Sequence, residues 1–226
     1  FWLAAATDRY CVASEYTRDL LLDMGVAGET IRVTGIPVDA IFRAKFDRRE
    51  LRRRYAIPDT AAVVLLVTGS FGIGPLEKIA AVLHTDCDVV VVCARNIKLL
   101  KNLQARRLAR VHAYGFVNTM PELMALSDLI VTKPGGLSVA ELLVMGVPPL
   151  FIAAIPGQET GNVRALEQRG IGVLLHGAAE VRRAVDALLR RRGVLLRGGH
   201  QVDDLAQRAF GRQLGHFDFQ RAAAVD

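Results

Sequence analysis

The sequence predicts an α/β fold, a Rossmann-like parallel sheet that is doubly wound by helices. Short segments that are apolar throughout recur from end to end of the chain, and amphipathic segments of helical length separate them. Strands that are apolar on both sides are typical of a sheet buried on both faces, and single helices between them make parallel crossovers. Because such crossovers are right-handed, the expected product is a doubly wound sheet.

The apolar segments give the expected strands Tyr10–Ala13, Ile31–Thr34, Val63–Thr68, Val89–Ala94, Val111–Gly115, Leu129–Thr132, Pro149–Ile152 and Gly172–Leu175. The amphipathic segments give the expected helices Glu15–Met24, Arg48–Tyr55, Pro75–Leu83, Lys98–Leu108, Met120–Leu126, Leu137–Met145, Gly161–Arg169 and Ala179–Arg191. Residues at the helix ends agree with these positions. Ser14 and Asp47 are suitable N-caps, and Gly25 can end the first helix in the left-handed conformation.

Composition narrows the class of protein. No stretch reaches the roughly 18 uninterrupted apolar residues of a membrane-spanning helix, so we expect no integral membrane segment. Cys11, Cys87 and Cys93 lie in or beside apolar runs without CxxC spacing, which indicates buried thiols in a reducing compartment. The five histidines form no HxxxH or HxxE pair, so we expect no metal site.

The net charge of +6 comes largely from clustered arginines. The clusters are Arg48, Arg49, Arg52, Arg53 and Arg54, then Arg106, Arg107 and Arg110, and then Arg190, Arg191 and Arg192. We interpret them as solvated helix faces. They lack the interleaved aromatics of a nucleic-acid surface, so no nucleic-acid partner is expected. An anionic membrane surface stays open as a partner.

Ligands of open parallel sheets bind at the carboxyl ends of the strands, so the loops after the strands are the candidate sites. The first is "GSFGIG", residues 69–74, which precedes a helix with Pro75 in its first turn. Ser70 and Gly72 could approach an anion at the helix start. The glycine spacing alone fits an ordinary tight turn equally well, and it matches neither a Walker A nor a dinucleotide pattern.

The second loop contains Phe116 and Val117, whose main chain could hold a planar base, although Phe116 is equally explained as core. The third begins with Pro134, Gly135 and Gly136, ahead of a helix that starts at Leu137. A pyrophosphate could lie over these glycines, favoured by the helix dipole.

Glu141 lies one to two turns into that helix, and its carboxylate could accept two hydrogen bonds from a ribose diol. It could equally be only a partner of the helix dipole. The segment "IPGQETGN" then places Gln158, Glu159 and Asn162 at the mouth of the same cleft. Gln158 and Glu159 suit sugar hydroxyls, and Asn162 suits either a helix cap or a further hydrogen bond.

With these residues assembled, "TKPGGLSVAELLVMGVPPLFIAAIPGQETGN" resembles the donor-binding segment of the monogalactosyldiacylglycerol synthase and processive diacylglycerol glucosyltransferase family. These are GT-B glycosyltransferases related to the murein lipid-intermediate GlcNAc transferase. "CVASEYTRDLLLDMGVAGETIRVTGIPVDAIF" is similar to the piece joining the family's two domains, "VTGSFGIGPLE" to its glycine loop, and "YGFVNTMPELMALSDLIVTKPGG" to its nucleobase loop. The likeness covers residues 8 to 175 in order.

The resemblance implies an inverting transfer of a hexose from a UDP-sugar to a lipid acceptor, with no cofactor and no metal. It implies that Phe116 and Val117 frame uracil and that Glu141 holds the ribose. Gly135, Gly136 and Leu137 would face the diphosphate, with Ser70 on its other side. Gln158 and Glu159 would read the transferred sugar.

Two features depart from the family. Asp39 stands where relatives often carry a basic residue. The family's acceptor domain, with its general base, precedes this region, so the catalytic base is not identified. We expect residues 1–13 to be the end of that domain or an interdomain strand, 14–198 the UDP-sugar donor domain, and 199–226 a helical tail. The expected location is the cytoplasmic face of a membrane, as a peripheral protein.

Three alternatives remain from the sequence. One is a GlcNAc transferase of peptidoglycan synthesis, which uses UDP-GlcNAc. Another is a UDP-GlcNAc epimerase, which shares the fold, although no acid and base residues for it are identified. The last is a non-catalytic UDP-sugar-binding subunit that needs a partner chain.

Overall fold

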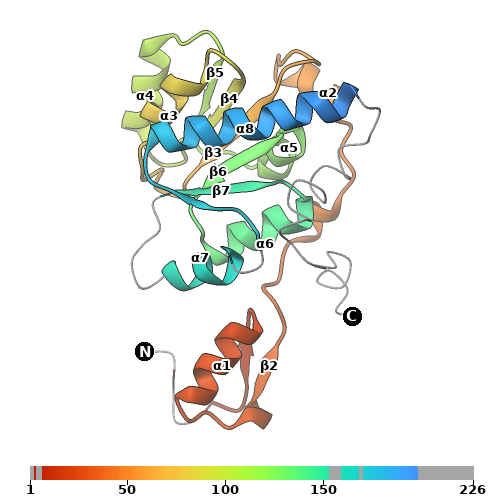
Figure 1. Cartoon of the computed structure of the whole chain (residues 1–226), viewed down its shortest axis with the longest axis vertical. Coiled ribbons are helices and arrows are strands. Elements are labelled where there is room, and N and C mark those ends of the chain that lie inside the picture. Colours follow the sequence, from red (N-terminus) through yellow and green to blue (C-terminus); the bar gives the residue numbers. More distant parts are fainter. Residues whose placement is uncertain (1–2, 4–6, 153–158, 168–169, 198–226) are drawn as a thin grey trace.

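The computed structural model describes residues 3, 7–152, 159–167 and 170–197, the last seven of them as backbone. Six strands form one parallel sheet in the order β5-β4-β3-β6-β7-β8 (Figure 1). They are β3 (Val63–Val67), β4 (Asp88–Val92), β5 (Val111–Tyr114), β6 (Leu129–Thr132), β7 (Pro149–Ile152) and β8 (Leu174–Leu175). The expected doubly wound parallel sheet is confirmed.

Helices cover both faces of this sheet. They are α2 (Arg48–Arg54), α3 (Leu76–Leu83), α4 (Ile97–Arg106), α5 (Met120–Leu126), α6 (Gly136–Met145), α7 (Thr160–Glu167) and α8 (Ala178–Arg197). Val64 and Leu66 of β3 pack with α3, α4 and α8, whereas Val63, Leu65 and Val67 pack with α2, α5 and α6. Side chains alternate across a strand, so one apolar strand supplies the core of both layers. Figure 1 shows α8 lying across the sheet.

The first two strands form a separate sheet. β1 (Tyr10–Val12) pairs in parallel with β2 (Ile31–Val33), with α1 (Glu15–Asp23) and the short 3₁₀ turn η1 (Gly28–Thr30) between them. Figure 1 shows this unit below the larger sheet, joined to it by one extended stretch. The predicted domain boundary after Ala13 falls inside the unit, between β1 and α1. Periodicity identified both strands but could not say which sheet they join.

Local signals at the helix ends are confirmed. The side chain of Ser14 accepts a hydrogen bond from the N–H of Thr17, and that of Asp47 accepts from Arg49 and Glu50. Gly25 has φ +84°, the left-handed conformation expected of a residue that follows a helix. β8 is shorter than predicted because Gly172 has φ +70° and lies against Phe151.

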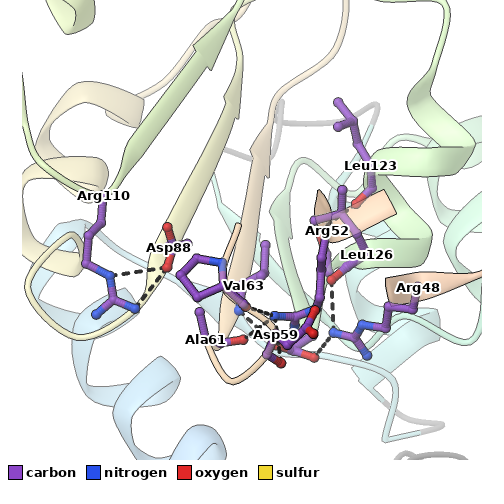
Figure 2. Close-up of polar contacts among 12 residues, drawn as sticks. Arg48, Arg52, Asp59, Ala61, Val63, Asp88, Arg110, Leu123 and Leu126 are labelled. Carbon is purple, nitrogen blue, oxygen red and sulfur yellow. Dashed lines mark hydrogen bonds and ion pairs between the residues drawn. The ribbon is translucent and has the colours of Figure 1, made fainter. Parts of the chain in front are cut away.

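A network of ion pairs lies at the amino ends of β3, β4 and β6 (Figure 2). The side chain of Asp128 is 2% exposed and accepts a hydrogen bond from the N–H of Val63 at 2.8 Å. It pairs with Arg48 and, at 3.7 Å, with Arg52. On the next strand, Arg110 pairs with Asp88 at 2.9 Å. The pairs of Arg48 and Arg52 with Asp128 fasten α2 to the sheet at the end opposite the loops considered for binding.

The interpretation of the arginines of α2 as a solvated face is wrong for Arg52. Its side chain is 4% exposed and donates to the carbonyl oxygens of Pro58, Asp59 and Ala61. A buried guanidinium needs this number of acceptors, because burying a charge without partners is costly. Periodicity alone could not reveal that the loop after α2 curls back to supply them.

The three cysteines differ in exposure. Cys87 and Cys93 are buried as expected, but Cys11 is exposed, because it faces away from Val12 in a sheet of only two strands.

Within the described ranges, none of the helices combines the length and apolar character that crossing a bilayer requires.

Candidate functional site

The candidate site lies where the sheet changes its winding direction. From β3 the chain proceeds outward through β4 and β5, whereas β6, on the other side of β3, leads outward through β7 and β8. The loops that leave β3 and β6 therefore diverge, and such a switch point is where open α/β sheets bind ligands. Val67 is paired with Thr132, so Thr68 and Gly69 stand beside Lys133 and Pro134. The two glycine loops predicted from the sequence thus meet.

The loop after β3 is held in shape by the loop after β4. The main-chain carbonyl of Ser70 accepts from the N–H of Arg95 at 3.2 Å, and that of Gly72 accepts from Asn96 Nδ2 at 3.3 Å. Gly72 has φ +54°, and a Cβ there would lie 2.7 Å from the carbonyl oxygen of Cys93. Gly72 therefore shapes the loop from a buried position, while Ser70 is exposed at its tip.

The loop after β6 leads into α6 without a side-chain cap. Gly135 is the N-cap residue, and it carries no side chain that could bond to the first turn. The opening amides of a helix have no partner within it, so the N–H groups that follow Gly135 are available to an anion. Pro134 is buried beneath this turn, and Leu137 is 56% exposed beside it. The turn therefore lies between a buried residue and an exposed one.

Ile36 lies on the other side of this turn. A Cβ on Gly136 would stand 2.9 Å from Ile36 Cδ1, so glycine allows the close approach. Ile36 belongs to the "GIPV" segment that leads from β2 to the 3₁₀ turn η2 (Ala40–Arg43). The Asp39 side chain caps η2 by accepting from the N–H of Ile41 at 2.9 Å. The departure from the family at Asp39 therefore has a local structural reason.

Glu141 is partly buried on α6. Burial raises the pKa of its carboxyl group above the ordinary value of 4.5. Among the residues that the structure describes, its carboxylate makes no hydrogen bond or ion pair. A partly buried carboxylate without a partner is a candidate for binding a ligand's hydroxyl groups.

The start of α7 is fastened to the loop after β6. Asn162 Nδ2 donates to the carbonyl oxygen of Pro134 at 2.9 Å, so Asn162 makes a structural contact rather than capping its own helix. Lys133 Nζ donates to Glu159 Oε1 at 3.3 Å, and the two side chains are 17% and 8% exposed. Glu159 thus lies at the switch point, where its carboxylate is engaged by a cation. Gln158 lies outside the described residues.

Sequence reasoning gave no role to Lys133. The available signal was its place in "TKPGG", directly after a buried strand and before a glycine turn. A lysine at such a position stands at the carboxyl edge of the sheet with the loops that bind ligands.

Phe116 and Val117 follow β5, two strands away from β3. Phe116 is 68% exposed, which excludes the alternative that it is ordinary core, whereas Val117 packs against the core. A Cβ on the preceding Gly115 would lie 3.9 Å from the carbonyl oxygen of Ala94 in the loop after β4. The predicted base-binding loop is therefore joined, through the loop after β4, to the glycine loop of Ser70.

The assembled site suits a ligand with an anionic centre and hydroxyl groups. It offers the opening amides of a helix, a half-buried carboxylate and an exposed aromatic, from loops and helices at one edge of the sheet. Among the described residues, no group of three or more His, Cys, Asp or Glu side chains could hold a metal ion. Near the start of α6, a charged ligand would meet helix amides and Lys133.

Two family models match the chain. The Glycosyltransferase family 28 C-terminal domain matches residues 74–189, just over half of the chain, and the Monogalactosyldiacylglycerol (MGDG) synthase family matches residues 1–38. Similar curated proteins are named processive diacylglycerol beta-glucosyltransferase. The one from Bacillus licheniformis is 29% identical over 196 residues, which cover 83% of this chain and 51% of that protein. The one from Bacillus subtilis is 29% identical over 210 residues, covering 90% and 55%.

The chain spans about half the length of the curated relatives it matches. Among solved structures, a glycosyltransferase from Rickettsia africae has a TM-score of 0.63 at 15% identity, covering 96% of this chain and 61% of that one. Anabaena HepE in complex with UDP-glucose has a TM-score of 0.58 at 18% identity, covering 96% and 62%. Both likenesses concern the fold, which is the GT-B type that the sequence predicts.

Proposed function

Since the chain belongs to the glycosyltransferase family 28 C-terminal domain family, we propose that it is the donor-binding half of an inverting hexosyltransferase. The proposed reaction moves a hexose from a UDP-sugar to a lipid acceptor of the diacylglycerol type. The names of the curated relatives support the acceptor class. The observation that carries the proposal is the meeting of two glycine loops at the switch point, beside the start of α6, whose N-cap residue is Gly135.

The donor is proposed to lie along the carboxyl edge of the sheet. Its uracil lies at Phe116 and Val117, its ribose at Glu141 and its transferred sugar at Gln158 and Glu159. The diphosphate lies between the exposed Ser70 and the turn of α6, the latter consisting of Pro134, Gly135, Gly136 and Leu137. Gly72 and Asn162 support this arrangement through the contacts that fix the two loops.

The chemistry assigned to this half is stabilisation of the leaving group. The acceptor hydroxyl attacks the anomeric carbon as the bond from that carbon to the diphosphate oxygen breaks, and UDP leaves with the bonding electrons. The acceptor's proton passes to a general base, which we place in an acceptor-binding half outside this chain. Amides fixed at the start of α6 are already oriented toward the charge that develops, so they need no reorganisation during the reaction.

We further propose that the enzyme works as a peripheral protein on the cytoplasmic face of a membrane, where a lipid acceptor resides. The net charge of +6 supports this location, since each cation near an anionic bilayer adds about 1 kcal/mol of attraction. The acceptor-binding half is proposed to be either a preceding domain or a partner subunit.

Thermal unfolding in the presence of nucleotide sugars tests the proposed donor class. A ligand that binds only the folded chain stabilises it by about 2.7 kcal/mol at a concentration 100 times its Kd. We expect UDP-glucose or UDP-galactose to raise the melting temperature, and ADP-, GDP- and dTDP-sugars to leave it unchanged. A preference for UDP-GlcNAc would favour the peptidoglycan-type transferase instead. No response to any UDP-sugar would reject the proposal.

A further inference from the structure

Lys133 is a largely buried cation at the switch point, and the proposed donor contacts give it no role. It follows β6 directly, and its side chain is 17% exposed. Its ammonium group donates to Glu159 Oε1 at 3.3 Å, and the Glu159 side chain is 8% exposed. Removing an ion pair from water in this way costs stability. Replacing a buried ion pair by apolar residues of similar volume often leaves the fold equally stable or more stable. The pair therefore calls for a reason beyond folding.

The pair lies between the two glycine loops. A Cβ on Gly69 would stand 3.9 Å from Lys133 Cε, and a Cβ on Gly135 would stand 3.7 Å from Glu159 Oε1. Lys133 thus reaches the loop after β3, while Glu159 reaches the turn that opens α6. The two charges stand where the loops proposed to surround a diphosphate come together.

Thr68 adds a second observation at the same place. It is 1% exposed, and its Oγ1 makes no hydrogen bond within the described part of the chain. The pairing of Val67 with Thr132 places Thr68 beside Lys133. A buried hydroxyl without a protein partner is uncommon in native proteins, and a bound water or ligand would supply its missing hydrogen bond.

We propose that Lys133 binds the diphosphate of the donor, and that Glu159 holds its ammonium at the switch point until the donor arrives. This inference rests on the proposed function and identifies the cation of that site. Lysine is well suited to phosphate as a compact point charge, and a charge-assisted contact is about twice as strong as a neutral one. As the bond to the sugar breaks, the diphosphate oxygen that gains the bonding electrons meets this positive charge.

A structural ion pair makes a different prediction from a ligand-binding cation. If Lys133 served only to fasten α7 through Glu159, removing either charge would weaken the fold similarly and would affect all ligands alike. If Lys133 binds the diphosphate, removing it weakens only ligands that carry the diphosphate. Removing the charge of Glu159 then frees the ammonium, so UDP should bind as tightly as it does to the wild type, or more tightly.

Calorimetric titration of the 226-residue chain with UDP and uridine separates these cases. We expect Lys133→Met to lower the affinity for UDP by about 10- to 100-fold and to leave uridine within about twofold. Glu159→Gln should bind UDP at least as tightly as the wild type. Lys78→Met, which removes an exposed lysine of α3, is the matched control and should change neither ligand.

The double variant Lys133→Met/Glu159→Gln guards against misfolding, because it leaves no unpaired buried charge. It should retain uridine binding with the same loss of UDP affinity. The inference would be overturned if either variant that lacks Lys133 bound UDP with wild-type affinity. It would also be overturned if the affinities for UDP and uridine fell equally. Failure of the wild-type chain to bind UDP at all would instead reject the proposed function.

Discussion

Ile36 Cδ1 lies 2.9 Å from the point that a Cβ on Gly136 would occupy, which joins the "GIPV" segment to the turn that opens α6. That segment leads from the β1-α1-β2 unit, and the turn is the proposed seat of the diphosphate. The contact is between the end of a flexible side chain and a backbone. The segment that precedes the main sheet therefore contacts the turn that opens α6.

Two glycine variants should differ in stability because their neighbours differ. Gly72→Ala places a Cβ 2.7 Å from the Cys93 carbonyl at φ +54°, so we expect a loss of about 2–4 kcal/mol in the free energy of unfolding. Gly136→Ala meets only Ile36 Cδ1, which can rotate, and alanine favours a helix by about 1 kcal/mol. Its net change should be within about 1 kcal/mol. Urea unfolding measures both, and equal losses would contradict the described packing.

Glu141→Ala should weaken UDP binding by about 1–3 kcal/mol, because a charge-assisted hydrogen bond to the ribose is lost. Titration with 2′-deoxy-UDP provides the control. The wild type should bind this analogue less tightly than UDP, and the variant should discriminate less between the two. If the wild type and the variant discriminated equally between UDP and 2′-deoxy-UDP, Glu141 would be ruled out as the ribose ligand.

Glu141 should also make stability depend on pH. Burial raises the pKa of its carboxyl above 4.5, so between the unfolded and folded pKa values the native state holds more protons. Stability therefore falls as pH rises through that window and stays lower at neutral pH. Glu141→Gln should be more stable than the wild type at pH 7, and its advantage should vanish below about pH 4. Urea unfolding at a series of pH values measures the difference, and an advantage of the variant that does not change with pH would contradict the prediction.

Asp128→Asn should cost about 3–5 kcal/mol of stability, because it leaves buried Arg52 without its carboxylate. Arg52→Met should also destabilise, since the carbonyl oxygens of Pro58, Asp59 and Ala61 lose their donor. Arg53→Met, at the exposed neighbouring position on α2, is the matched control and should change stability by less than about 0.5 kcal/mol. Similar behaviour of Arg52 and Arg53 variants in chemical unfolding would refute the network in Figure 2.

The thiols should react unequally. Burial raises the pKa of Cys87 to about 12 and that of Cys93 to about 11, so neither forms appreciable thiolate near neutral pH. Cys11 is exposed. Titration of the native chain with a chromogenic disulfide at pH 8 should modify Cys11 rapidly, and the other two only after unfolding. Fast modification of all three in the native state would show that the core around β4 is open.

The strands, helices and caps could be predicted because they depend on local chemistry. Val63 to Val67 are apolar at every position, which is enough to indicate a strand buried on both faces. Asp47 and Ser14 cap helices through hydrogen bonds within three residues. The order of strands around β3 and the separate pairing of β1 with β2 depend on contacts between distant segments, which periodicity does not specify.

The candidate site was predictable in part for the same reason. The glycines at 69, 72 and 136 stand out because a positive φ or a close approach requires them. Lys133 and Thr68 do not stand out, since a lysine or threonine after a strand has many uses. Only the pairing of β3 with β6 shows that they lie side by side. The burial of Arg52 could not be predicted from periodicity, because its acceptors come from the loop that follows its own helix.

The most direct test of the account is a crystal structure of the chain with UDP. We predict the diphosphate oxygens within hydrogen-bonding distance of the amides after Gly135 and of Lys133, with the ribose hydroxyls on Glu141. A nucleotide bound elsewhere, or an α6 turn closed by its own neighbours while UDP stays in solution, would contradict the account.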